Sequence, residues 1–173
     1  MSYYREALEN WLGTLSIKAD KVADVGGKDK PMDDRRAKSW EVKRTIEYDL
    51  PDFDLNKDLI YNDCDVLFCL EVFEYIYDPV RAITSLAALC KKGATLYISF
   101  PFIYPHHQPL GMDYLRYTRS GIIKLCDIAG LTIMDLEERL AKVPETLLDF
   151  YKTEGMHVGG DSTVTGFLLT AKK

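Results

Sequence analysis

Carboxylates and glycines follow two apolar segments of this sequence, in positions suited to binding a polar ligand. Asp24, Gly26 and Gly27 stand at the end of the first segment. Glycine lets the backbone approach a ligand closely, and the Asp24 carboxylate can organise the turn. Glu71 ends the second segment, Val66–Leu70, whose length and composition are typical of a strand buried on both faces. Since ligands of open parallel sheets lie beyond the carboxyl ends of strands, we expect a cofactor beside Glu71.

A second group of reactive side chains lies in the segment 101–117. His106 and His107 are adjacent, and adjacent side chains do not face one ligand in a helix or strand. No H-x-x-x-H or carboxylate-rich pattern surrounds them, so we expect no metal site. Either histidine is a candidate general base for an acceptor hydroxyl, or a surface residue. Asp113 and Arg116 are spaced closely enough to pair and brace this long loop.

The elements that must position these residues alternate between strands and helices, which predicts an α/β domain with a mainly parallel sheet. Asp78-Pro79 and Thr118 are typical helix starts, and Gly93 and Gly130 are typical helix ends. We expect helices over 3–16, 78–92, 118–129 and 144–152, and strands over 21–25, 45–50, 66–70, 94–100, 131–136 and 164–172.

Length and composition favour a single domain over residues 1–173, in the cytoplasm. The chain carries a net charge of −5, and its compact basic cluster, 35–38, follows two aspartates, so we expect no long nucleic acid partner. No run of about 18 apolar residues appears, so we expect no membrane span. The cysteines lack a C-x-x-C pair and are interpreted as packing residues in a reducing compartment: Cys64, Cys69, Cys90 and Cys126.

Four motifs resemble those of class I S-adenosylmethionine-dependent methyltransferases, in the same order. They are DVGGKDKP at 24–31, CDVLFCLEVFEYIYDPVRAI at 64–83, KKGATLYISFPF at 91–102 and DYLRYT at 113–118. The resemblance implies a Rossmann-like, mainly parallel sheet of seven strands. An antiparallel last strand and helices on both faces are also implied. It further implies an N-terminal helix over 1–17 and an active-site loop over 101–117.

The same resemblance implies site residues for S-adenosylmethionine and an acceptor. Asp24, Gly26 and Gly27 would form the loop beneath the methionine moiety. Asp49, or alternatively Glu47, would bind the ribose hydroxyls. The remaining cofactor residues would be Asp54, Leu55 and Asn56 near the adenine, with Leu70 and Glu71 at the end of the fourth strand. The acceptor would meet residues of the 101–117 loop: Tyr104, Asp113, Tyr114, Arg116 and Tyr117.

Two residues depart from the family pattern and leave alternatives open. Lys28 stands where the family has its second glycine, and Tyr75 stands where it has a histidine. Our first hypothesis is a methyltransferase acting on an oxygen of a small or sugar-like acceptor. The second is a cofactor-binding or scaffold protein disabled by these two residues. A nicotinamide-dependent oxidoreductase is disfavoured because the G-x-G-x-x-G pattern is incomplete.

The sequence does not decide which segment covers the expected pocket. The 101–117 loop, the N-terminal helix or a partner subunit of a homodimer could each close it. Methyl transfer from a sulfonium needs chiefly an acceptor held in line and kept from water, so no catalytic triad is expected.

Overall fold

The computed structural model describes residues 3–27, 40–106, 111–142, 158–159 and 162–173, with the single residues 147, 149 and 153. Its helices are α1 (Tyr3–Thr14), α3 (Pro79–Ala88) and α4 (Arg119–Ala129), with a 3₁₀ turn η1 (Phe73–Tyr75). Its strands are β1 (Lys18–Val25), β2 (Glu41–Tyr48), β3 (Cys64–Cys69), β4 (Cys90–Pro101), β5 (Thr132–Lys142), β6 (Val158–Gly159) and β7 (Ser162–Lys172). Lys28, His107 and most of the helix expected over 144–152 lie outside the described residues; Leu147 and Asp149 are helical.

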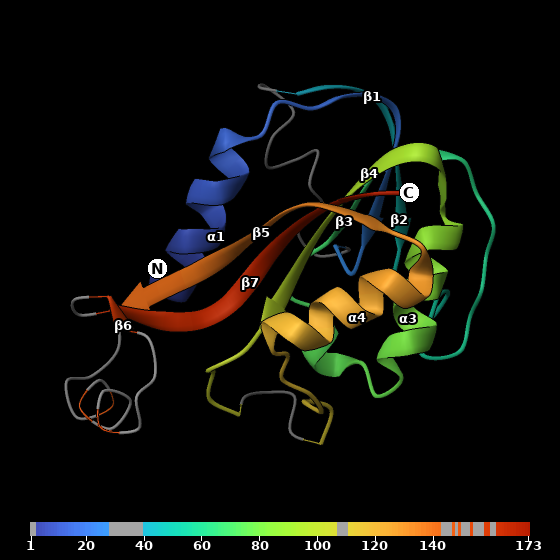
Figure 1. Cartoon of the computed structure of the whole chain (residues 1–173). Coiled ribbons are helices and arrows are strands. Elements are labelled where there is room, and N and C mark those ends of the chain that lie inside the picture. Colours follow the sequence, from blue (N-terminus) through green and yellow to red (C-terminus); the bar gives the residue numbers. More distant parts are fainter. Residues whose placement is uncertain are drawn as a thin grey trace.

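The main sheet has the order β2-β1-β3-β4-β7-β5, with β6 pairing only to β7 (Figure 1). The strands β2, β1, β3 and β4 are mutually parallel, and β7 is antiparallel to both β4 and β5. The predicted α/β class and the antiparallel last strand are therefore confirmed.

The sheet differs from the expected seven-stranded form at its β2 edge. Six strands make up the main order, and the two-residue β6 is the seventh. Residues 49–63, all described, contain no strand. A parallel crossover takes a dozen or more residues. The 15 residues between β2 and β3 therefore suffice for the single crossover that joins them, and another strand at this edge would need a second crossover.

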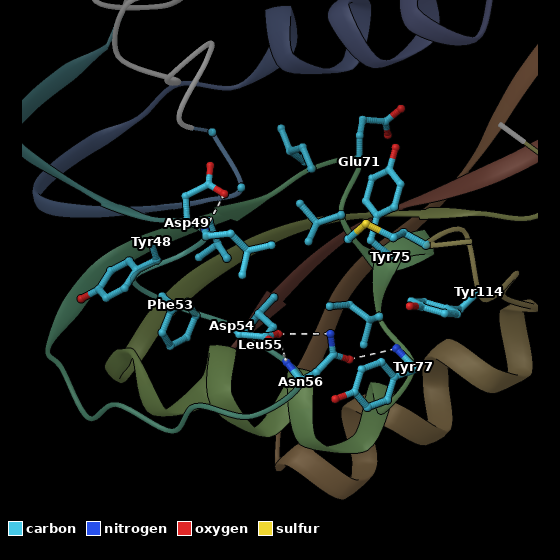
Figure 2. A pocket seen from close by; sticks show the side chains of 18 of the residues that line it. Tyr48, Asp49, Phe53, Asp54, Leu55, Asn56, Glu71, Tyr75, Tyr77 and Tyr114 are labelled. Atoms are coloured by element: carbon cyan, nitrogen blue, oxygen red, sulfur yellow. Dashed lines mark hydrogen bonds between the residues drawn. The ribbon is translucent and has the colours of Figure 1, made fainter. Parts of the chain in front are cut away.

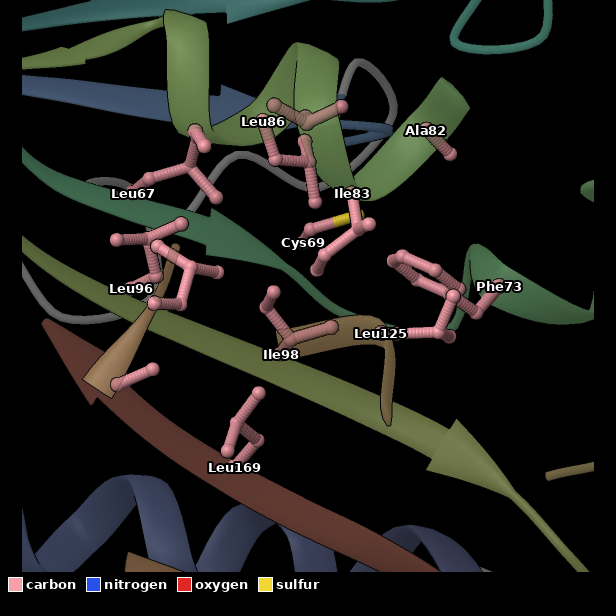
Figure 3. Close-up of a cluster of buried hydrophobic side chains, with 14 of the residues drawn as sticks. Leu67, Cys69, Phe73, Ala82, Ile83, Leu86, Leu96, Ile98, Leu125 and Leu169 are labelled. Carbon is pink, nitrogen blue, oxygen red and sulfur yellow. The ribbon is translucent and has the colours of Figure 1, made fainter. Parts of the chain in front are cut away.

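Helices cover both faces of the sheet, as expected. Strand β3 is buried on both sides because its side chains alternate between the two faces. Val66 and Phe68 pack with Leu8, Trp11 and Leu12 of α1. On the other face a larger cluster forms against α3 and α4 (Figure 3), and it includes Leu67, Cys69, Ile83, Leu86, Leu96, Ile98 and Leu125.

The predicted ends of the helices are confirmed with one exception. Asp78 caps α3 by accepting the Arg81 N–H, Thr118 caps α4 by accepting the Gly121 N–H, and Gly130 ends α4 in a left-handed conformation. Gly93, predicted as the end of the preceding helix, lies instead within β4. The prediction was wrong because α3 ends at Ala88, and buried Cys90 already pairs with Cys64 of β3.

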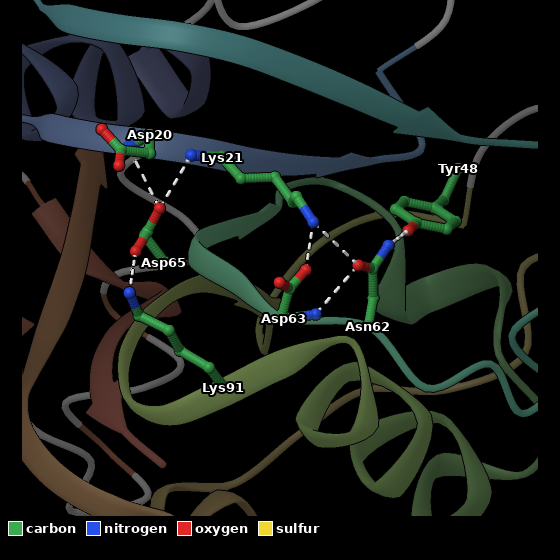
Figure 4. A network of polar contacts seen from close by, with 7 residues as sticks. All are labelled: Asp20, Lys21, Tyr48, Asn62, Asp63, Asp65 and Lys91. Carbon is green, nitrogen blue, oxygen red and sulfur yellow. Dashed lines mark hydrogen bonds and ion pairs between the residues drawn. The ribbon is translucent and has the colours of Figure 1, made fainter.

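A polar network joins β1, β3 and β4 at the edge opposite their carboxyl ends (Figure 4). One Asp65 oxygen accepts the backbone N–H groups of Asp20 (3.0 Å) and Lys21 (2.7 Å), and the other pairs with Lys91. The Lys21 ammonium pairs with Asp63. These contacts fix the relative positions of β1 and β3, whose opposite ends line the site.

Among the described residues no helix is long and apolar enough to cross a membrane. The four cysteines are buried and free, which confirms their interpretation as packing residues. Cys90 lies in β4, however, and not on a helix.

Candidate functional site

A pocket of about 590 Å³ lies at the carboxyl ends of β1, β2 and β3 (Figure 2). Its volume is within the range of small-molecule and cofactor sites. It is lined by the β1 end with Gly26 and Gly27, by residues 48–50, 53–57, 70–72 and 75–77, by Arg5 of α1, and by Met112 with Tyr114. The pocket is therefore at the sheet edge where ligands of parallel sheets bind.

The floor of the pocket depends on two glycines. Gly26 adopts φ +79°, and its N–H donates to the Tyr48 carbonyl at 3.0 Å, joining the ends of β1 and β2. A Cβ at Gly26 would lie 2.4 Å from Cγ2 of Val72, and one at Gly27 would lie 2.3 Å from Oδ2 of Asp24. Asp24 is buried beneath this turn and does not itself line the pocket.

Asp49, expected at the ribose, is the first residue after β2 and lines the pocket. Its Oδ1 accepts the Leu50 N–H at 2.8 Å. Glu47, the alternative, is exposed on β2 and is not among the lining residues. Strand β2 begins at Glu41, four residues before the expected start at residue 45.

Asp54 and Leu55, expected near the adenine, line the pocket from a tight turn. One Asp54 oxygen accepts the Asn56 N–H at 2.9 Å, and the other pairs with Lys57 at 3.0 Å. Partial burial alone would raise the pKa of the Asp54 carboxyl, but these contacts hold it below the usual value. Asn56 in turn accepts the Tyr77 N–H at 2.9 Å, which fastens this turn to the segment before α3.

Leu70 and Glu71 line the pocket where β3 ends. Glu71 adopts φ +60°, which is uncommon for a residue with a side chain. Its N–H donates to Ser99 Oγ at 2.8 Å, and that hydroxyl donates back to Glu71 Oε1 at 2.7 Å. Arg139 pairs with the same carboxylate, with Nη1 at 2.7 Å from Oε1 and Nη2 at 3.3 Å from Oε2.

Most of the residues expected at the acceptor hold the 101–117 loop together. Arg116 forms a bidentate pair with the buried Asp113 side chain, including a 2.7 Å contact, and donates to the carbonyls of Tyr104 and Pro105. Tyr117 is buried, and its hydroxyl donates to the Phe73 carbonyl at 2.9 Å. Of the five expected residues, Tyr114 lines the pocket.

The structure places His106 on the surface and not among the lining residues. His107 lies outside the described residues. In the described part of the chain, no group of three or more His, Cys, Asp or Glu side chains is arranged to hold a metal ion.

Sequence reasoning did not assign Arg5 or Lys57 to the pocket, and it placed Met112 there only as part of the 101–117 loop. For Arg5 no sequence signal pointed there, because it reaches the pocket only through the packing of α1 against the sheet. Tyr75 also lines the pocket, and burial together with nearby carboxylates raises its pKa to about 12. Figure 2 shows its hydroxyl end directed toward Glu71.

The described residues fit S-adenosylmethionine. The two glycines leave a backbone cradle that a Cβ would fill, Asp49 offers a carboxylate beyond β2, and Leu55 and Ile76 offer apolar surface. This set suits a ligand with hydroxyl groups at one end and an aromatic base at the other.

Comparisons with known proteins agree on the architecture. No protein-family model and no curated protein sequence matches the chain. A Haloferax volcanii protein solved in complex with the methyltransferase activator Trm112 aligns with TM-score 0.70, 17% identity, and coverage of 98% of this chain and 89% of that one. A Methanosarcina mazei S-adenosylmethionine-dependent methyltransferase aligns with TM-score 0.59 and 13% identity, over 95% and 96% of the two chains.

A Brevibacillus brevis polyketide-synthase O-methyltransferase, solved with S-adenosyl-L-homocysteine, aligns with TM-score 0.59 and 13% identity, over 99% of this chain and 72% of that one. Identities this low establish the fold alone. The chain therefore has the fold of class I S-adenosylmethionine-dependent methyltransferases.

Proposed function

We propose that this protein is an S-adenosylmethionine-dependent methyltransferase that methylates an oxygen atom of a small-molecule or sugar-like acceptor. The observation that carries the proposal is the pocket at the ends of β1, β2 and β3, with its floor formed by Gly26 and Gly27 over buried Asp24. The likeness of the fold to S-adenosylmethionine-dependent methyltransferases supports it.

In this proposal the glycine turn and Leu70 hold the methionine portion of the cofactor, Asp49 accepts hydrogen bonds from the ribose hydroxyls, and Asp54 and Leu55 lie along the adenine. The cofactor supplies an activated methyl group. The chain binds the cofactor and the acceptor, orients them in line and excludes water from them, which is what in-line transfer requires of a protein.

The acceptor end of the pocket is assigned to Arg5, Tyr75, Met112 and Tyr114, which line it from α1, η1 and the 101–117 loop. Tyr75 serves there as a neutral hydroxyl, because a pKa of about 12 keeps its proton in place at neutral pH. The base for a hydroxyl acceptor is assigned to His106 or His107, which belong to the same loop as Met112 and Tyr114.

The cover of the pocket is assigned to α1 and the 101–117 loop, since both contribute lining residues. Tyr77, Met112 and Tyr114 are exposed there, and a homodimer or another protein partner would bury them. Light scattering of the purified protein tests for the dimer; a monomer at all concentrations would exclude it.

Calorimetry with S-adenosylhomocysteine tests the central proposal, with NAD and NADP as controls. We expect saturable binding of S-adenosylhomocysteine and a rise in Tm, and no effect of the nicotinamide nucleotides. A folded protein that binds none of the three would contradict the proposal.

A second candidate is a cofactor-binding protein without transferase activity. It is favoured by the set of lining residues, which includes no histidine within the described part of the chain. Radiolabelled S-adenosylmethionine and a panel of hydroxylated small molecules separate the two candidates. Binding without labelled product from any acceptor would favour the second.

A further inference from the structure

Arg139 lies on β5, three strands away from β3, yet its guanidinium reaches Glu71. The arginine is only 1% exposed and its side chain is fully buried. An ionised side chain is buried at a large cost in hydration unless a partner compensates it. The Glu71 carboxylate, part of whose side chain stays accessible, provides that compensation.

A glycine on β7 makes room for this crossing. Gly166 is the register partner of Arg139 on one side and of Pro101 on the other. A Cβ at Gly166 would lie 2.5 Å from the Phe100 carbonyl oxygen and 3.6 Å from Arg139 Cδ. The Arg139 side chain therefore passes over a strand position that has no side chain.

Ser99 of β4 completes the arrangement on the way to β3. It is fully buried, and its hydroxyl both accepts the Glu71 N–H and donates to the Glu71 carboxylate. Ser99 and Arg139 thus hold Glu71 from β4 and β5 at once.

Glu71, held by Ser99 and Arg139, has an uncommon backbone conformation that shapes the wall of the pocket. Glu71 has φ +60°, and the chain turns there at the end of β3. The turn places Leu70, Glu71 and Val72 along the pocket wall and sets the Val72 side chain against Gly26. Without the two anchors, Glu71 would be free to relax to an extended or right-handed conformation, which residues with a Cβ prefer.

We propose that Arg139 is a positioning residue of the pocket: by binding the Glu71 carboxylate it keeps Glu71 in the left-handed conformation that forms the wall beside Gly26. The pocket's identity as a S-adenosylhomocysteine site rests on the proposed function. Arg139 itself is not among the lining residues, so its influence on a ligand passes through Glu71.

The test uses Arg139→Met, which replaces the charge with an unbranched apolar chain and leaves Glu71 with access to water. We expect its Kd for S-adenosylhomocysteine, measured by calorimetry, to rise at least 10-fold. Arg119→Met is the matched control, because Arg119 also bonds to β5, at the Leu136 carbonyl, but lies outside the pocket lining. We expect that variant to bind like the wild type.

The double variant Glu71→Gly/Arg139→Met separates positioning from stability. Glycine adopts a left-handed conformation without an anchor. We therefore expect the double variant to recover binding to within about 3-fold of the wild type, even where its Tm stays low. A purely stabilising arginine would lower the Tm of Arg139→Met and leave its Kd unchanged, which would overturn the proposal.

Equal weakness of the single and double variants would also overturn it, since the Glu71 carboxylate itself would then be what the ligand needs. If Arg139→Met does not fold, Arg139→Lys and Ser99→Ala take its place, each expected to raise the Kd several-fold; unchanged values in both would contradict the proposal. Failure of the wild type to bind S-adenosylhomocysteine would instead refute the proposed function, and the inference with it.

Discussion

The buried carboxylate of Asp24 lies directly against the backbone of Gly27, so that a Cβ on residue 27 would stand 2.3 Å from Oδ2 and 2.4 Å from Oδ1. Asp24 is 3% exposed and short, so its carboxylate cannot swing aside as the end of a long side chain can. The pair explains why the turn after β1 carries glycine and fixes the floor of the pocket.

Gly27→Ala is therefore expected to displace the turn and raise the Kd for S-adenosylhomocysteine at least 10-fold by calorimetry. Gly13→Ala is the control, because nothing lies within 4 Å of a Cβ there and alanine favours a helix. Unchanged binding by Gly27→Ala would mean that the turn does not contact the ligand.

Asp24 and His106 differ in their expected effects on the same measurement. Asp24→Ala removes the buried carboxylate beneath the glycine turn and should weaken S-adenosylhomocysteine binding. His106→Ala changes an exposed residue outside the pocket lining and should leave binding within about 2-fold. The opposite ranking would place the site elsewhere.

Asp65 links stability to pH through the network at the opposite edge of the sheet. The Lys91 ion pair, followed by the Lys21 N–H, holds the pKa of the Asp65 carboxyl below its usual value. A lowered pKa in the folded state contributes stability that is complete above the unfolded-state pKa of about 4 and is lost as the pH falls through the lower folded value.

We therefore expect Asp65→Asn to lower the Tm by about 2–4 °C at pH 7 and progressively less below pH 4. Asp127→Asn, which breaks an exposed pair with Lys124, should change the Tm by less. Scanning calorimetry at pH 7, 5 and 3.5 checks both. A Tm difference for Asp65→Asn that grew toward low pH would contradict the sign.

Tyr117 anchors the 101–117 loop to η1 through a buried hydrogen bond. Tyr117→Phe keeps the ring contacts with Phe73 and Phe100 but leaves the Phe73 carbonyl without this donor. We expect a loss of about 1 kcal/mol in the free energy of unfolding in urea. Tyr61→Phe, at a residue that is 79% exposed, should cost nothing measurable.

Arg116 holds the same loop from its other side. Arg116→Lys keeps the charge but loses the bidentate pair with Asp113 and the contacts to two carbonyls. Limited proteolysis should therefore cut the loop several-fold faster, while S-adenosylhomocysteine binding changes by less than about 3-fold. Lys124→Met, on the exposed face of α4, serves as the comparison. Equal cleavage rates would show that the loop does not depend on Arg116.

The sequence by itself determined most of the elements and the place of the pocket. Local signals suffice for these, because Asp78, Thr118 and Gly130 act within one helical turn and the apolar run of β3 reports burial on both faces. Sequence spacing also predicted the Asp113–Arg116 pair. The prediction that Gly93 ends a helix was wrong, because Cys90 already pairs with Cys64 of β3 and β4 therefore begins before residue 93.

Tertiary structure alone decided the contacts that join distant segments. Arg139 and Glu71 are 68 residues apart, and no local pattern in either segment predicts their ion pair. Their meeting depends on sheet order and on the space above Gly166. The absence of a further strand in the described segment 49–63 likewise followed from chain length and topology, since one crossover uses all the residues between β2 and β3. Local patterns report which element a residue joins, whereas contacts across the sheet depend on how all the strands are ordered.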